Sequence, residues 1–332
     1  MIDDDEIERV SLVRSYLQLL RLPNIFTAMA DAAMGFLFVE AAWAWDDAGG
    51  LRPLGLWAVG VIVAASSLLY AGGVVLNDVF DLERDREERP ERPLPSGRVS
   101  LRTARWLGWD LLLLGAMLPC GVAVLLHRAL PGADLGVAVR PAAVALILAL
   151  AIVLYNTVLK PTLLGPLAMG ACRMLNVLLG MSVLRGPLGP EHWLVAGAIG
   201  VYITGVTWFA RDESQRSDRR QLAGAMMFMM AGVAMLAWLP RWSENLNWMI
   251  RQDPQQWYLL MALLGGIIGL RSLWAIALPV PGRVRVAIAQ AILSLVFLDA
   301  AACYAVRGPY WAAMILLLLL PAVFFGRWIA ST

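Results

Sequence analysis

The chain contains ten stretches of about 20 mostly apolar residues, the length that an α-helix needs to cross a bilayer. They cover residues 22–42, 54–76, 104–126, 137–159, 163–184, 193–210, 222–239, 257–278, 286–306 and 310–328. Because backbone polar groups find no water in lipid, each stretch is predicted to be a helix. Only 16% of residues are charged and 60% are hydrophobic, which excludes soluble enzymes and nucleic-acid-binding modules. We predict one polytopic, all-α membrane domain over residues 1–332, with nine to ten transmembrane helices.

The connections between these stretches differ in charge. One set of alternate connections holds 19 Arg and Lys residues and the other holds 7, while Arg173 lies inside a predicted span. Short loops rich in arginine and lysine stay in the cytoplasm. Both termini and the segments 78–103 and 211–220 are therefore predicted to be cytoplasmic, and we expect an integral protein of the bacterial inner membrane.

The first cytoplasmic segment begins with an acidic run, Asn-Asp-Val-Phe-Asp-Leu-Glu-Arg-Asp, over residues 77–85. If the second helix continues past Leu76, then Asp78, Asp81 and Asp85 share one helix face. Like charges so placed repel each other unless a divalent cation lies between them, and hard carboxylate oxygens favour Mg²⁺. Because Mg²⁺ shares its ligand shell with substrate phosphates, the run predicts a site for a magnesium-bound diphosphate. The alternative is a solvated loop in which neighbouring arginines balance the acids.

The run resembles the first aspartate-rich motif, N-D-x-x-D-x-x-x-D, of the UbiA superfamily of intramembrane prenyltransferases. The following Arg-Pro-Leu-Pro-Ser-Gly, residues 92–97, is similar to the R-P-x-x-x-G segment of that family. Tyr155 and Lys160 resemble its tyrosine-to-lysine signature, with one residue more than the usual Y-x-x-x-K spacing. Asn24 stands where the family often has a cleft-lining asparagine. The resemblance covers about residues 21–218 and implies a UbiA-like bundle, to which the tenth span is additional.

The second cytoplasmic segment departs from the family pattern. The family's second motif reads D-x-x-D-x-x-x-D, but when the pattern is anchored on Asp212 its flanking acidic positions hold Phe209 and Arg216. Glu213 or Asp218 would supply oxygens in a different register, and Arg216 would pair with Asp212 or contact a phosphate. This variant is similar to the UbiA-like branch named EboC, and it leaves a second metal site open.

The resemblance implies transfer of an isoprenyl group from a prenyl diphosphate donor to an unidentified acceptor. Mg²⁺ would neutralise the diphosphate as the C–O bond breaks, held by Asp78, Asp81, Asp85, Asp212 and Asp218. Lys160 would bind the leaving diphosphate, and the Tyr155 ring would stabilise the allylic cation. The expected substrate-binding side chains are those of Asn24, Asn77, Arg86, Arg89, Arg92, Arg173, Asn176, Asp212, Glu213 and Arg216.

Two questions stay open on the sequence alone. Arg173 and Asn176 share a helix face, and they either line a central cavity or belong to an internal ion pair. In the second case, the partner of Arg173 is Asp31 or Asp299. For the whole protein, the eroded second motif also suits a non-catalytic prenyl-lipid binding protein or a transporter on the same scaffold.

Overall fold

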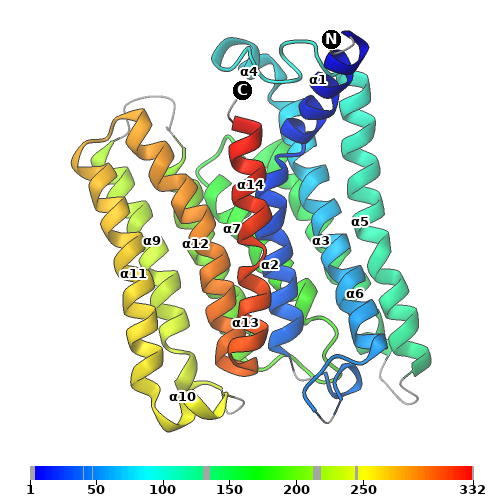
Figure 1. Ribbon diagram of the computed structural model, residues 1–332, viewed down its shortest axis with the longest axis vertical. Coiled ribbons are helices and arrows are strands. Elements are labelled where there is room, and N and C mark those ends of the chain that lie inside the picture. Colours follow the sequence, from blue (N-terminus) through cyan, green and yellow to red (C-terminus); the bar gives the residue numbers. More distant parts are fainter. Residues whose placement is uncertain are drawn as a thin grey trace.

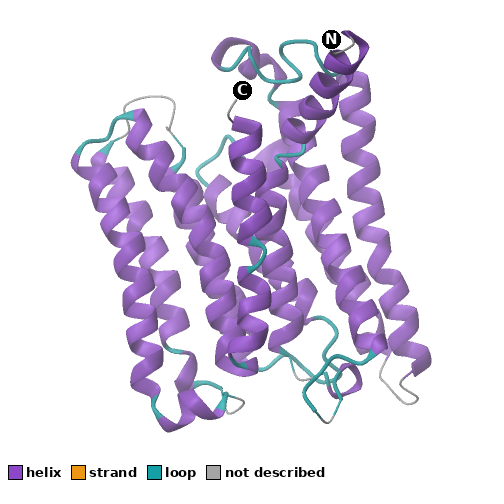
Figure 2. Ribbon diagram, in the orientation of Figure 1, coloured by secondary structure: helices purple, strands orange, loops and turns teal. Residues whose placement is uncertain are grey.

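A computed structural model describes residues 4–39, 41–46, 48–129, 135–211, 218–243 and 246–330. Within these ranges the chain is helical and contains no β-strand beyond one isolated bridge between Trp45 and Leu51 (Figure 2). The long helices run side by side as one bundle (Figure 1). The predicted all-α class is confirmed.

The α-helices are α1 (Asp4–Leu19), α2 (Leu22–Phe38), α3 (Pro53–Phe80), α4 (Leu82–Glu88), α5 (Leu101–Ala129), α6 (Leu135–Leu154), α7 (Gly165–Met181), α8 (Pro190–Phe209), α9 (Arg219–Ala237), α10 (Trp248–Gln252), α11 (Pro254–Ala277), α12 (Pro281–Arg307), α13 (Pro309–Leu316) and α14 (Leu319–Ala330). A π-helical turn, η2 (Tyr155–Leu159), follows α6, and two 3₁₀ turns are η1 (Ala42–Ala44) and η3 (Leu239–Arg241). Eight helical segments of the described chain are long and apolar enough to cross a membrane, and α2 and α7 are shorter apolar helices. All ten predicted stretches are thus helical.

Proline marks the start of many of these helices. It occupies the first or second position of α2, α3, α7, α8, α11, α12 and α13. Proline suits these positions because the first turn leaves its N–H groups unpaired and because proline fixes φ at a helical value. The tenth stretch is broken between α13 and α14, where Pro321 cannot donate a hydrogen bond to the carbonyl four residues before it.

Helices α2 and α7 cross in close contact at the centre of the bundle. A Cβ atom added to Gly180 of α7 would overlap the carbonyl oxygen of Ala32, and one added to Gly35 of α2 would overlap that of Val177. Two backbones approach this closely only where side chains are absent. The crossing fixes α2 in the interior, where Phe36 is fully buried.

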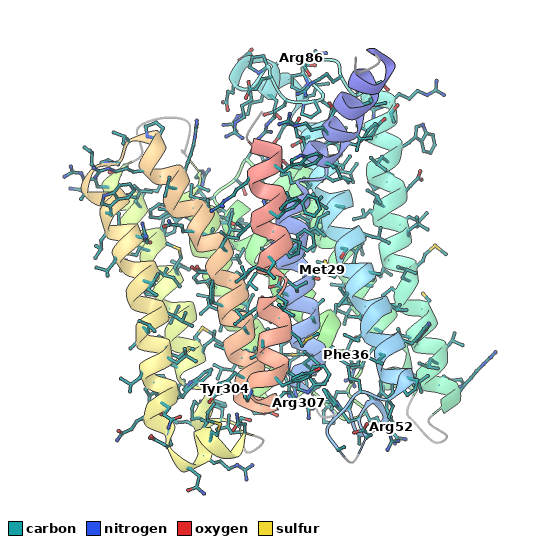
Figure 3. The ribbon with its side chains drawn as sticks, viewed as in Figure 1. Met29, Phe36, Arg52, Arg86, Tyr304 and Arg307 are labelled. Carbon is teal, nitrogen blue, oxygen red and sulfur yellow. The ribbon has the colours of Figure 1, made fainter. Side chains whose placement is uncertain are left out.

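The two ends of the bundle differ. Helices α1 and α4 and the loop that follows α4 lie at one end (the motif end), next to the last turns of α14 (Figure 1). Arg307 lies near the opposite end, at the end of α12 and close to Phe36 (Figure 3). Its guanidinium donates to the carbonyl oxygens of Leu37 and Val39, each at 2.7 Å, and lies 4.2 Å from the ring centroid of Trp45. Arg307 therefore satisfies carbonyl groups that the end of α2 leaves unpaired.

Candidate functional site

The aspartate run lies at the motif end, where α3 is followed by α4. Helix α3 continues one turn past Leu76 as expected, but it ends at Phe80, and α4 begins at Leu82. Asp81 lies between the two helices with φ −88° and ψ 2°. The helical hydrogen bonds continue across this turn, since the Asp81 N–H donates to the Asn77 carbonyl oxygen at 3.0 Å and the Asp85 N–H donates to the Asp81 carbonyl oxygen at 2.8 Å. The three aspartates thus keep helical spacing, but Asp81 pairs with a different cation from the other two.

Asp78 and Asp85 share a pair of arginines. Arg21 Nη2 lies 2.7 Å from Asp78 Oδ1, and Arg92 Nη1 lies 2.7 Å from Asp85 Oδ2 and 3.5 Å from Asp78 Oδ1. The side chains of Asp78 and Asp85 are 6% and 7% exposed, so water screens these pairs less than it screens a surface salt bridge. A cavity of about 230 Å³ opens beside them. It is lined by Gln18, Arg21, Asp78, Glu91, Arg92 and Pro93.

Asp81 forms a separate ion pair with Lys160. The Lys160 ammonium contacts Asp81 Oδ2, and the two side chains are 26% and 24% exposed. Burial lowers the pKa of Lys160, and the nearby Asp81 carboxylate offsets only part of that lowering. The motif end thus carries a second carboxylate and cation, supplied by the residues that directly follow α3 and η2.

Arg21 has an unusual backbone conformation. Its φ of 45° and ψ of 50° lie in the left-handed region, and it is the only residue other than glycine with positive φ among the described residues. Such a residue costs about 1–3 kcal/mol and persists where the surroundings hold it. Burial disfavours the charged guanidinium, but Asp78, Tyr70 and Asp85 together outweigh this, so the pKa of Arg21 lies above its usual value. No sequence signal distinguishes Arg21, because an arginine before a first span is common at cytoplasmic ends.

A π-helical turn positions Tyr155 relative to Lys160. The Lys160 backbone N–H donates to the Tyr155 carbonyl oxygen at 2.9 Å, across the turn η2. A π turn holds one residue more than an α turn, and such turns occur often at functional sites. The extra residue in the Tyr155–Lys160 spacing is therefore absorbed within a single turn. The two side chains keep the one-turn separation that Y-x-x-x-K has in a regular helix.

Asn77 links α3 to this π turn. Its Nδ2 donates to Asn156 Oδ1 at 2.8 Å, and Asn156 Nδ2 donates to the Gly73 carbonyl oxygen at 3.1 Å. These bonds fasten α3, the helix that precedes Asp81, to the turn that precedes Lys160. Asn77 was predicted to bind substrate, and the structure gives its amide a positioning contact.

Comparisons with known proteins add to this geometry. The sequence pattern of the UbiA prenyltransferase family matches residues 33–282, which is most of the chain. The chain belongs to this family. The digeranylgeranylglyceryl phosphate synthase of Saccharolobus solfataricus is 40% identical over 106 residues, which cover 32% of this chain and 34% of that enzyme. The chain thus spans about a third of the length of this curated relative.

Solved structures of UbiA relatives share the fold. A structure of digeranylgeranylglyceryl phosphate synthase in membranes is similar with a TM-score of 0.61 at 18% identity, covering 90% of this chain and 100% of that chain. A UbiA homolog from Archaeoglobus fulgidus bound to DMAPP and Mg²⁺ is similar with a TM-score of 0.54 at 14% identity, covering 86% and 99%. The chain is thus a UbiA-like, all-α integral membrane bundle.

Three predicted site residues of this UbiA family member lie outside the ion pairs described above. Arg86 pairs with Glu83 at 2.8 Å on the exposed side of α4, at the outer edge of the motif end (Figure 3). Arg89 caps the carboxyl end of α4. Asn24 is half-buried in the first turn of α2, and its carbonyl oxygen accepts a hydrogen bond from the Thr27 hydroxyl at 2.8 Å.

The predicted second motif lies only partly in the described chain. Asp212, Glu213 and Arg216 are outside the described residues. Asp218 is the N-cap of α9, and its Oδ1 accepts a hydrogen bond from the Arg220 backbone N–H at 3.1 Å. No group of three His, Cys, Asp or Glu side chains suited to a metal occurs within the described ranges. The second metal site stays a prediction.

Arg173 and Asn176 belong to a buried polar cluster. Arg173 Nη1 donates to Asp31 Oδ2 at 2.7 Å, and Arg173 Nη2 donates to Thr27 Oγ1 at 3.0 Å. Asn176 Nδ2 also donates to Asp31 Oδ2, at 3.2 Å. The Arg173 guanidinium lies 5.1 Å from the ring centroid of Tyr70. Of the two alternatives left by the sequence, the contacts of Arg173 are those of an internal ion pair with Asp31.

Proposed function

We propose that this protein transfers an isoprenyl group from a prenyl diphosphate to an acceptor inside the bilayer. The observation that carries this proposal is the mixture of carboxylates and cations at the motif end, where Asp78 contacts both Arg21 and Arg92 beside a cavity. A diphosphate with its metal ion carries both signs of charge and is complementary to such a mixture. Membership of the UbiA prenyltransferase family supports the same reaction.

The carboxylates fit Mg²⁺ as a cofactor. Asp78 and Asp85 both lie beside Arg92, so their oxygen atoms are neighbours. Mg²⁺ takes hard oxygen ligands, and one or two protein carboxylates suffice when phosphate and water oxygens complete its shell. Asp78 and Asp85 would hold the ion, with Asp81 as a third ligand once the diphosphate replaces it as the partner of Lys160. The ion would supply positive charge that stabilises the leaving diphosphate. The A. fulgidus homolog named above was solved with Mg²⁺ and DMAPP, which supports this assignment.

The cationic residues of the motif end would bind the diphosphate itself. Guanidinium groups form paired hydrogen bonds with phosphate oxygens, which suits Arg21 and Arg92. Lys160 would add a third cation, and Tyr155 one turn before it would offer a ring face to the allylic cation. The isoprenyl chain would lie among apolar helices, where exclusion of water protects that cation from hydrolysis.

The placement in the membrane follows from the charge distribution. All ten apolar helices would cross the bilayer, with the motif end and both termini on the cytoplasmic side of a bacterial inner membrane. Two features bear on the acceptor but point to different relatives. The chain is similar to digeranylgeranylglyceryl phosphate synthases, whereas its variant second motif suggests the EboC branch, so the acceptor stays undetermined.

The direct test is turnover of a labelled prenyl diphosphate by the purified protein. Asp81→Asn should lower Mg²⁺-dependent product formation at least about 100-fold, because it removes both a metal ligand and the partner of Lys160. Asp110→Asn, at an exposed position of α5, is the matched control and should retain activity. Full activity of Asp81→Asn, or activity that survives a chelator, would contradict the proposal.

A second candidate is a non-catalytic prenyl-lipid binding protein or transporter. It is favoured by one observation: Asp218, the described acid of the second segment, is used as a helix cap. This candidate predicts that labelled geranyl diphosphate binds but that mass spectrometry detects no prenylated product with aromatic or polyol-phosphate acceptors. A prenylated product that depends on Asp81 would eliminate it.

A further inference from the structure

Two aspartates approach each other deep inside the bundle, away from the motif end. Asp31 belongs to α2 and Asp299 to α12, and both are 0% exposed. Met29, two residues before Asp31, lies between the two ends of the bundle (Figure 3). The pair therefore lies at the depth of the hydrocarbon core, where water is scarce. Both aspartates also lie outside the family-matched residues 33–282.

The oxygen atoms of this pair are incompletely satisfied by the side chains around them. Asp31 Oδ2 accepts hydrogen bonds from Arg173 and Asn176, at 2.7 and 3.2 Å. Asp31 Oδ1 and both carboxyl oxygens of Asp299 are buried and have no N–H or O–H donor in the described chain. The two carboxyl groups nevertheless lie within hydrogen-bonding reach of each other. Two ionised carboxylates cannot bond in this way, because both are acceptors only.

The charge balance of the cluster also indicates that the two carboxyl groups are not both ionised. Arg173 contributes one positive charge, against two carboxyl groups that would carry two negative charges if both were ionised. Among charged groups, Asp299 interacts most strongly with Asp31, and Asp31 interacts most strongly with Arg173. The other titratable groups nearby are Tyr70 of α3, beside the guanidinium, and Cys303, one turn after Asp299 on α12. Arg307 lies two turns beyond Asp299 and bonds to the end of α2. An uncompensated charge in this interior is strongly unfavourable.

We propose that Asp31 and Asp299 form a proton-binding site that holds one proton at neutral pH. The proton lies between the two facing carboxyl groups, turns one of them into a donor, and leaves the cluster with Arg173 electrically neutral. A divalent metal ion would instead add one charge too many and would need about six oxygen ligands. The pair joins α2 to α12, so the shared proton acts as a latch between these two helices.

The latch lies beside the broken helix α13–α14. That helix packs on α2, where the rings of Phe325 and Phe26 stack with centroids 6.1 Å apart. Loss of the proton would place two adjacent negative charges between α2 and α12 and drive these helices apart. Contact between α2 and α12 is therefore coupled to protonation, independently of the reaction at the motif end.

Infrared spectroscopy of the full chain in lipid nanodiscs at pH 7 tests the site. Ordinary aspartates are ionised at this pH, so a protonated carboxylic acid gives a separate carbonyl-stretch band. The band should be present, should shift in D₂O, and should shift again when aspartate carboxyl groups carry ¹³C. Absence of an aspartate band in the unmodified protein overturns the proposal, and this measurement requires no variant.

Variants then locate the proton. Asp299→Asn and Asp31→Asn each leave one carboxylate for one guanidinium, so each should abolish the band, while Asp110→Asn should leave it unchanged. A band that survives both single variants overturns the proposal. A missing band combined with a melting temperature that rises with Na⁺, but not with choline, would also overturn it and would identify a monovalent cation site.

Discussion

Deletion of Val158 tests whether the π turn η2 keeps the site in register. Val158 is 54% exposed on this turn, so its removal costs little packing. The deletion leaves three residues between Tyr155 and Lys160, and the π turn becomes an ordinary α turn. Lys160 stays one turn after Tyr155, and its ion pair with Asp81 is expected to persist.

Deletion of Ile147 is the matched control. This residue is 51% exposed and belongs to the regular part of α6. Each residue of an α-helix turns the chain by about 100° and advances it by about 1.5 Å. Since side chains end about 5–6 Å from the helix axis, the lost residue moves each side-chain end about 8 Å around it. Such a displacement breaks the bonds of Asn156 to Asn77 and Gly73 and removes Tyr155 from the site.

The assay is the Kd for geranyl diphosphate with Mg²⁺, together with the melting temperature followed by tryptophan fluorescence. Deletion of Val158 should change Kd by less than about threefold, whereas deletion of Ile147 should weaken binding at least about tenfold, or about 1.4 kcal/mol. Only the Ile147 deletion should lower the melting temperature by several degrees. Equal losses in the two deletions would refute the view that the π turn maintains the register.

Three other changes test separate parts of the structure. Gly180→Ala should lower the melting temperature, because the added Cβ overlaps the α2 backbone and such overpacking costs about 1–3 kcal/mol. Arg307→Met should lower the free energy of unfolding by about 3–5 kcal/mol, because it removes two charged hydrogen bonds. Arg241→Met, which loses only a stacking contact with a tryptophan, should have little effect on stability. Equal losses of stability in the two variants would count against the capping role of Arg307. The lowered pKa of Lys160 means that its ammonium loses its proton at a lower pH than a free lysine does. As the pH is raised, the affinity for geranyl diphosphate should therefore fall before the pH reaches 10.5. Lys160→Arg should retain its affinity over the same pH range, because a guanidinium stays charged. If the unmodified protein and Lys160→Arg have identical pH profiles, the Lys160 ammonium is not a ligand of the diphosphate.

Much of the bundle is predictable because lipid permits few alternatives. A stretch of 20 apolar residues in a membrane must satisfy its backbone internally, so hydropathy alone locates all ten helices. The break in the tenth stretch has a local signal in Pro321, although a long apolar run conceals it. The motif aspartates were selected because their spacing is unusual for a solvated loop, and their role as metal ligands stays a prediction.

The arrangement of the site is less predictable because it depends on contacts between distant segments. The turn at Asp81 divides α3 from α4, although its local sequence contains no proline or glycine. The extra residue before Lys160 is visible in the sequence, but its absorption by a π turn is a property of the fold. Arg21 contacts Asp78 across 57 positions, and only the folded structure connects them.

The left-handed backbone at Arg21 lowers the stability of the protein at the residue whose guanidinium is proposed to bind the diphosphate. Glycine at this position would relax the main chain by about 1–3 kcal/mol, but it would also delete the guanidinium beside Asp78. Loss of the partner of a buried carboxylate is itself destabilising, so the strained backbone and the ion pair oppose each other in the stability of any variant at position 21, and every such variant except lysine loses the charge that would bind an anion. Engineering of a sturdier version of this protein should hold that residue constant and look for improvements elsewhere.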